Sequence, residues 1–151
     1  MGARGTSDHQ RLGVGALLIC AAFLLFARLG DRYLWQDEAE TAVLARNVLH
    51  DGYPRAFDGV HLLPVPFASH RPGYVWVFHP WVQFYLTAGS FAVFGTTTWA
   101  ARLPFALLGL ASVWLAWVVT RAFFHDGRIS LLTAGFLTTS VPFLLHMRQC
   151  R

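Results

Sequence analysis

The sequence predicts an all-α, polytopic membrane protein, and three observations support this fold class. Of the 151 residues, 55% are hydrophobic and only 13% are charged, which is too apolar for an ordinary soluble domain. Three apolar runs, 12–29, 102–124 and 129–146, come close to or exceed the ~20 residues that a helix needs to cross a bilayer. Most of the prolines and acidic residues fall between the first two runs. We therefore expect about three transmembrane helices and one long surface loop.

The first predicted span, 12–29, follows a polar tail, 1–11, that we expect in the cytoplasm. A cleaved signal peptide is the rival interpretation, because a basic start also precedes the apolar run of a signal. No small-residue cleavage site follows the run, since Ala27-Arg28-Leu29 is a poor substitute for one. We therefore expect an uncleaved membrane anchor.

The loop 30–101 is predicted to begin with a short helix at 37–50. Gly52 and Pro54 follow this segment, and both are residue types expected just past the C-terminus of a helix. The apolar side chains wrap most of the way round the helix, so the pattern does not indicate a one-sided amphipathic helix. We expect it to be wedged between the spans and the lipid headgroups.

A second apolar run in the loop, 81–94, is short for a span. At 1.5 Å per residue it covers about 21 Å, against a hydrocarbon core of ~30 Å. On length it should be an interfacial, juxtamembrane helix. Joining it back to Tyr74, with Pro80 as a kink, would make it long enough to cross, so a fourth span is the alternative.

The rest of the chain is predicted to contain the span 102–124, a turn at 125–128, the span 129–146 and a terminal segment, 147–151. With three spans, the turn lies on the same side as Arg4 and Arg11, in agreement with the positive-inside tendency. With four spans, Arg102 and Arg148 would lie inside instead. Charge does not choose between these topologies. The chain stops directly after an apolar run, so we expect a truncated piece of a longer protein.

Three carboxylates, Asp37, Glu38 and Glu40, lie just outside the first span. Acidic groups at a membrane boundary are costly and call for a functional hypothesis. The structural alternative is a capping box, in which Asp37 at the N-cap accepts a backbone N–H and Glu40 reaches back to the backbone. From spacing alone, both interpretations of Asp37 stay open.

Other polar residues suggest weaker hypotheses. The loop histidines His50, His61, His70 and His79 show no metal-binding spacing, so a divalent metal has no support and the cofactor stays unknown. Arg102 opens a span and could either snorkel to the headgroups or offer its guanidinium to a phosphate. All twelve basic residues are Arg, which weakly suggests a bacterial source. They form no basic run, so we expect no nucleic-acid partner.

The order of the motifs resembles the N-terminal part of the GT-C membrane glycosyltransferases, in particular the dolichyl-phosphate-mannose protein mannosyltransferases and the aminoarabinose lipid A transferases. The resemblance covers almost the whole chain, from Leu12 to about Leu145. It depends on these motifs in this order: Trp35-Gln-Asp-Glu-Ala-Glu40 with an Ala, an Arg and Gly52 after it, His79-Pro80, Val93-Phe94-Gly95 and Ala101-Arg102-Leu103-Pro104.

The resemblance implies a role for each matching residue. Asp37 matches the family's catalytic carboxylate, and Glu38 would stand beside it, either supporting Asp37 without touching the substrate or facing a metal ion. Arg102 and His79 match residues that contact the donor phosphate, although the family often has Lys where this chain has His79. A metal-holding acidic residue of the lipid A transferases is replaced here by Phe78, so that metal site is not carried over.

The predicted function is therefore the N-terminal portion of an inverting glycosyltransferase that moves a sugar from a polyprenyl-phosphate donor to an acceptor hydroxyl. Its partners would be membrane lipid, the lipid-linked sugar and a protein or glycolipid acceptor. We expect an integral protein of the bacterial plasma membrane with an extracytoplasmic active site, and we expect this piece alone to be inactive. The alternative is a non-enzymatic membrane protein, either a transporter fragment or a scaffold.

Overall fold

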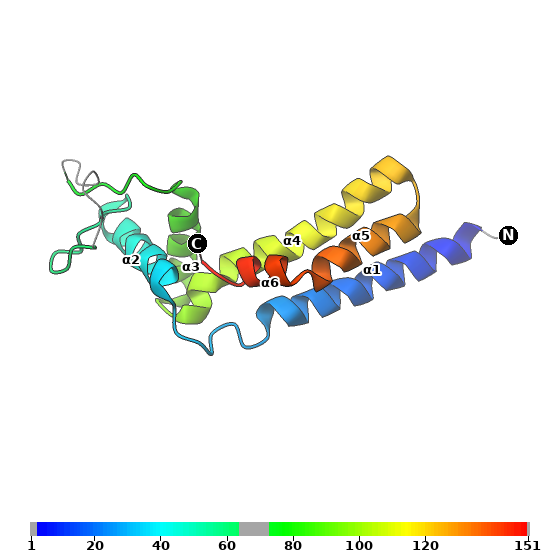
Figure 1. Cartoon of the computed structure of the whole chain (residues 1–151), viewed down its shortest axis with the longest axis horizontal. Coiled ribbons are helices and arrows are strands. Elements are labelled where there is room, and N and C mark those ends of the chain that lie inside the picture. The colour runs from blue at the N-terminus through cyan, green and yellow to red at the C-terminus, as the bar shows by residue number, and fades with distance from the viewer. Residues whose placement is uncertain (1–2, 64–72, 151) are drawn as a thin grey trace. The chain divides into compact units, whose positions relative to one another are not determined.

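The structure is a computed structural model that describes residues 3–63 and 73–150, and in these residues it contains helices and no β-strand. The prediction of an all-α fold is confirmed. His70 and three prolines of the predicted loop lie outside the described residues. The helices are α1 (Ala3–Phe26), α2 (Gln36–Asp51), α3 (Val82–Phe94), α4 (Thr98–Phe124), α5 (Gly127–Thr139) and α6 (Val141–Met147) (Figure 1).

The chain divides into two compact units. One, which we call the membrane unit, consists of residues 1–28 and 105–148 and contains α1, most of α4, α5 and α6. The other, which we call the loop unit, consists of residues 29–104 and 149–151 and contains α2, α3 and the start of α4.

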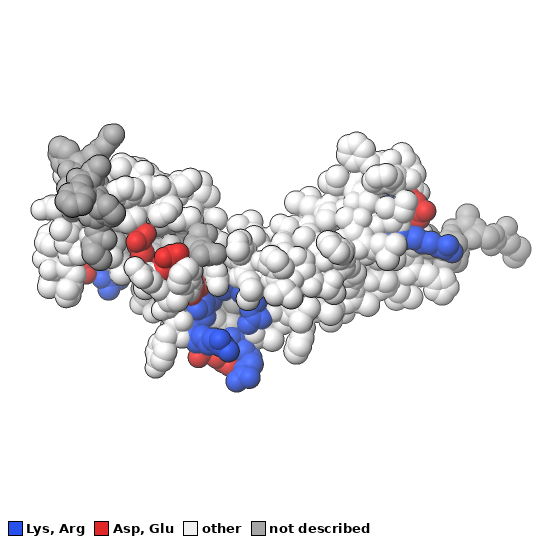
Figure 2. All heavy atoms as spheres, in the orientation of Figure 1, with Lys and Arg blue, Asp and Glu red and all other residues white. Residues whose placement is uncertain are grey.

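In the membrane unit, α1 packs against α5 around small side chains. Ala21, Val113 and Ala134 are fully buried at the centre of this packing. Small residues let helix backbones approach closely, which is a common solution when helices associate in lipid. The visible surface over the middle of these helices carries no charged atoms (Figure 2), as lipid contact requires.

Among the residues that the structure describes, two helices are long and apolar enough to cross a membrane, one ending at Phe26 and the other being α4. A third span exists if α5 and α6 together make one crossing, although they are bent by 65° relative to each other. The sequence pattern indicated one continuous run at 129–146. Ser140 is extended at the break, and Pro142 in the first turn of α6 has no N–H with which to continue the α5 hydrogen-bond pattern.

In the loop unit, α2 packs against α3. α2 ends where the sequence predicted, because Gly52 takes the left-handed conformation (φ 80°) and donates its N–H to the Val48 carbonyl. The residues that α2 buries follow helical spacing, with Leu44 and Ala45 beside the polar Glu38, Thr41 and Asn47. The buried stripe thus includes polar side chains, which a count of the apolar residues alone does not reveal.

The start of α4 is joined to α3 by a hydrogen bond that compensates for a proline. Pro104 lies inside α4 and has no N–H to donate to the Ala100 carbonyl one turn earlier. The Ser90 hydroxyl from α3 donates to that carbonyl instead, with an oxygen–oxygen distance of 2.6 Å. Thr97 caps the helix, since its hydroxyl accepts the N–H of Ala100. The loop unit thus fixes the first turn of α4. Arg102 follows directly after this turn.

Candidate functional site

Asp37 lies in the first turn of α2 with its side chain exposed. Its carboxylate lies at the N-terminal end of the helix, where the backbone N–H groups point outward. The predicted capping box of Asp37 and Glu40 was wrong, because the N-cap is Trp35, two residues before Asp37. The residue three positions on is then Glu38, and its carboxylate accepts the Trp35 N–H at 3.4 Å.

Glu38 is fully buried and pairs with Arg102. The Arg102 Nε lies 2.8 Å from one oxygen of the Glu38 carboxylate, and an Arg102 terminal nitrogen lies 2.6 Å from the other. This two-point contact is the strongest geometry that an arginine and a carboxylate can adopt. The two residues are 64 positions apart in the sequence.

The other N–H groups of Arg102 are also used. They donate to the backbone carbonyls of Leu29 at 2.9 Å, Arg32 at 3.0 Å and Tyr33 at 3.2 Å. A guanidinium has five N–H groups, and Arg102 makes five hydrogen bonds within the protein. In this arrangement every N–H of the guanidinium has an acceptor within the protein. The sequence had left open that Arg102 binds a phosphate, and such binding would need an N–H that is not already used.

The segment after α6 also reaches Glu38. The backbone N–H of Cys150 donates to the carboxylate at 3.2 Å, and the Cys150 thiol lies 3.8 Å from it. Burial alone would raise the pKa of Glu38, but the hydrogen bond and charge of Arg102, with the N–H groups of Cys150 and Trp35, hold it below its usual value. Burial and the neighbouring carboxylate raise the pKa of the Cys150 thiol to about 12, so it is a neutral thiol.

His79 lies near the same end of α2. Its Nδ1 is 3.8 Å from the Glu40 carboxylate, and its ring stacks on Trp76 with the ring centroids 6.0 Å apart. The carboxylates of Glu40 and Asp37 are close enough to interact electrostatically: burial raises the pKa of Glu40, the charge of His79 opposes this rise, and the charge of Asp37 adds to it. The structure thus brings His79 and the Asp37 turn together through Glu40.

The remaining loop histidines in the described part of the chain bind separate carboxylates. His50 lies 2.7 Å from Asp51, and His61 lies 3.5 Å from Asp58. Within the described residues, no three His, Cys, Asp or Glu side chains are grouped so that they could hold a metal ion. His70 lies outside these residues.

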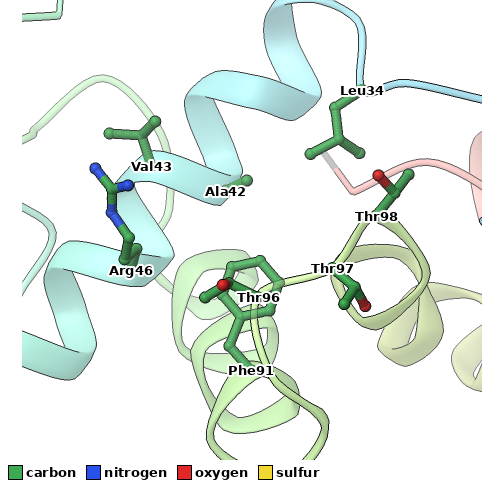
Figure 3. A pocket seen from close by; sticks show the side chains of 8 residues that line it. All are labelled: Leu34, Ala42, Val43, Arg46, Phe91, Thr96, Thr97 and Thr98. Carbon is green, nitrogen blue, oxygen red and sulfur yellow. The ribbon is translucent and has the colours of Figure 1, made fainter.

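A pocket of about 260 Å³ opens beside α2 in the loop unit (Figure 3). Apolar side chains from α2 and α3 line one part of it, and the hydroxyls of three successive threonines before and at the start of α4 line another. Its lining residues are Leu34, Ala42, Val43, Arg46, Phe91, Thr96, Thr97 and Thr98.

Sequence reasoning missed the Glu38–Arg102 pair and the Glu40–His79 contact, although one signal for the first was available. Glu38 has the helical spacing of the buried Thr41, Ala45 and Val48. A carboxylate on a buried stripe requires a cationic partner. The sequence could therefore have indicated that Glu38 needed an arginine, but not which one.

Comparisons with known proteins give two matches, and no solved structure matches the chain. Residues 78–150 match the family described as dolichyl-phosphate-mannose-protein mannosyltransferase. The undecaprenyl phosphate-alpha-4-amino-4-deoxy-L-arabinose arabinosyl transferase 2 of Pseudomonas fluorescens is 30% identical over 135 residues, which is 89% of this chain and 21% of that protein. The chain thus spans about a fifth of the length of this curated relative. Both matches confirm that the chain is similar to the membrane glycosyltransferases of the GT-C superfamily.

Proposed function

We propose that this chain is part of an integral-membrane glycosyltransferase that moves a sugar from a polyprenyl-phosphate donor to an acceptor hydroxyl. The similarity to two kinds of lipid-linked sugar transferase supports this function over a transporter fragment or scaffold. One structural observation carries the assignment of the site. Exposed Asp37 shares its helical turn with Glu40, whose carboxylate lies 3.8 Å from His79.

The proposed reaction is a direct displacement at the anomeric carbon of the donor sugar. The acceptor oxygen attacks this carbon, the bond between the carbon and the phosphate oxygen breaks, and the lipid phosphate leaves with the electron pair. Asp37 takes the proton of the acceptor hydroxyl as a general base. A single displacement inverts the anomeric configuration, which NMR of the product would detect.

His79 is the proposed contact for the departing phosphate. When protonated, its imidazolium stabilises the charge that grows on the phosphate oxygens as the glycosidic bond breaks. The Glu40 carboxylate lies 3.8 Å from its Nδ1 and holds the ring beside the first turns of α2. The donor brings its own activated bond, so the reaction calls for no nucleotide at this site.

The proposed enzyme is a bacterial plasma-membrane protein whose site faces the extracytoplasmic side. Its acceptor is a protein or a glycolipid. Because the 135 aligned residues make up only 21% of the matched relative, we expect the 151-residue chain to be inactive when it is expressed alone. Sugar transfer by that isolated chain would contradict this expectation.

The decisive test is Asp37→Asn in the complete gene product that carries these residues. Loss of a general base lowers kcat by about 100-fold to 10,000-fold, while membrane insertion and abundance stay unchanged because the exposed side chain keeps its shape. Radiolabelled polyprenyl-phosphate sugars supply the assay.

Asp51→Asn is the matched control, because Asp51 is a carboxylate at the opposite end of α2 and pairs with His50. It should retain wild-type transfer. Wild-type kcat in the Asp37→Asn variant would refute the catalytic assignment, and loss of the folded protein would restore a structural role for Asp37.

A further inference from the structure

We propose that Glu38 and Arg102 form a positioning pair that holds Asp37 in place, and that Arg102 does not bind the donor phosphate. This inference rests on the proposed function, since it assigns a task to the two residues on which the Asp37 site is built. It replaces the role that the position of Arg102 in the sequence suggested.

The first support is the path of the backbone around Arg102. The three carbonyls that accept its N–H groups, those of Leu29, Arg32 and Tyr33, belong to the connection that leads into α2. The remaining acceptor, Glu38, lies in the first turn of that helix. One side chain from the first turns of α4 therefore fixes both the approach to α2 and its start.

The second support is the cost of any other use of Arg102. The side chain is only 10% exposed and that of Glu38 is 0% exposed. A phosphate that took over an N–H group would leave a backbone carbonyl or the Glu38 carboxylate without its partner. A buried acceptor, above all a charged one, is costly to leave unsatisfied. The arrangement is complete without a ligand.

The third support is the relation of Glu38 to Asp37. Successive residues of a helix point about 100° apart, so a buried Glu38 turns the neighbouring Asp37 towards solvent, where its side chain is exposed. The N–H groups of Trp35 and Cys150 also bind the Glu38 carboxylate. Rotation or fraying of this first turn would move Asp37, and the pair opposes both motions.

The experiment compares Glu38→Gln, Arg102→Met and the double variant in the complete gene product. Misplacing a catalytic group by about 1 Å costs about 100-fold in rate, so kcat should fall by roughly that factor. The donor KM should change by less than about threefold, because neither residue contacts the donor. The double variant should be no slower than the worse single variant, because both changes remove one interaction.

Arg55→Met is the matched control, because Arg55 pairs with Asp51 in the same unit, at the opposite end of α2 from Glu38. It should leave kcat and KM unchanged. Abundance and thermal stability in detergent separate a kinetic effect from loss of folding. If Arg102→Met does not accumulate, Arg102→Lys decides, since it keeps a cation but cannot reproduce five hydrogen bonds.

Positioning predicts a low kcat for Arg102→Lys with an unchanged donor KM. A raised donor KM with a preserved kcat in Arg102→Met or Arg102→Lys would instead assign the phosphate contact to Arg102 and overturn the inference. Asp37→Asn keeps this outcome separate from failure of the proposed function. If Asp37→Asn is inactive while Glu38→Gln has the kcat of the wild type, only the positioning role fails.

Discussion

At the scale of single residues, two neighbours on one helical turn have opposite environments. Asp37 is exposed, whereas Glu38 is buried against Arg102. The adjacent acidic residues of the sequence thus differ in access: the Asp37 side chain is exposed to solvent, and the Glu38 carboxylate is held by Arg102 inside the protein. The difference arises from the helical rotation between them and not from any difference in chemistry.

The lowered pKa of Glu38 makes a prediction about acid stability. Since the carboxyl pKa is lower in the folded state than its ordinary value near 4.5, the ionised group stabilises the fold at all pH values above the ordinary pKa. This contribution is lost as the pH falls through the lowered folded value. Thermal unfolding in detergent between about pH 7 and about pH 3 should show this loss.

Glu38→Gln supplies the comparison for this prediction. The variant should be less stable at neutral pH and should lose less stability on acidification, because its amide does not titrate. Parallel stability curves for the two proteins would show that Glu38 does not carry the acid dependence. Asp58, whose pKa the N–H groups of His61 and Val60 lower to about 2, titrates in both proteins.

A second prediction at this scale concerns the charge that His79 offers to the donor phosphate. His79→Gln removes any positive charge from this position and should raise the donor KM, whereas His79→Lys keeps a cation there and should leave the donor KM close to the wild-type value. Steady-state kinetics with a polyprenyl-phosphate sugar measure both. A wild-type donor KM in His79→Gln would contradict the assignment.

At the scale of helices, the join between α3 and α4 depends on Ser90 and Pro104. Ser90→Ala should destabilise the protein by about 1–3 kcal/mol, because it leaves the buried Ala100 carbonyl unsatisfied. Pro104→Ala restores a backbone N–H that can bond to this carbonyl. In that background Ser90→Ala should cost clearly less. Thermal unfolding of the four proteins measures the coupling, and additive effects would show that the Ser90 hydrogen bond does not compensate for the proline.

The helices themselves were largely predictable from the sequence, because each depends on local signals. Apolar runs located α3 and α4, and Gly52 marked the end of α2. The N-cap of α2 was predicted two residues too late, at Asp37, because the prediction used an acidic side chain as the cap, whereas in the structure Trp35 and Glu38 form the capping box. The bend at Ser140 depends on Pro142, and the run of apolar residues concealed it.

The site was less predictable, because its contacts join distant parts of the chain. Asp37 and His79 were selected by their resemblance to family motifs, and no sequence signal indicated that Glu40 lies between them. The Glu38–Arg102 pair joins residues 64 positions apart. Two buried charges produce no periodicity in the sequence. Only the three-dimensional fold shows that Arg102 already has five acceptors within the protein.

At the scale of the whole molecule, the number of membrane crossings decides on which side each loop lies. With three spans, the chain crosses once through α1, once through α4 and once through α5 with α6. If the N-terminal tail is cytoplasmic, as predicted, the surface loop that contains Val60 then lies outside, and the turn that contains His125 lies inside. If the stretch that ends in α3 also crossed, both segments would lie outside.

Two cysteine substitutions distinguish these topologies in the complete gene product. Val60 is 79% exposed, and His125 is an exposed residue of the turn between α4 and α5. A membrane-impermeant maleimide added to intact cells should label Val60→Cys above the background of the unaltered protein, whose own cysteines are Cys20 and Cys150. It should label His125→Cys only after the membrane is permeabilised.

Labelling of both variants in intact cells would establish the fourth span, because α3, at 13 residues, would then have to cross together with the residues before it. Labelling of neither would contradict an extracytoplasmic site, because Val60 and Asp37 lie on the same loop between the first two predicted spans.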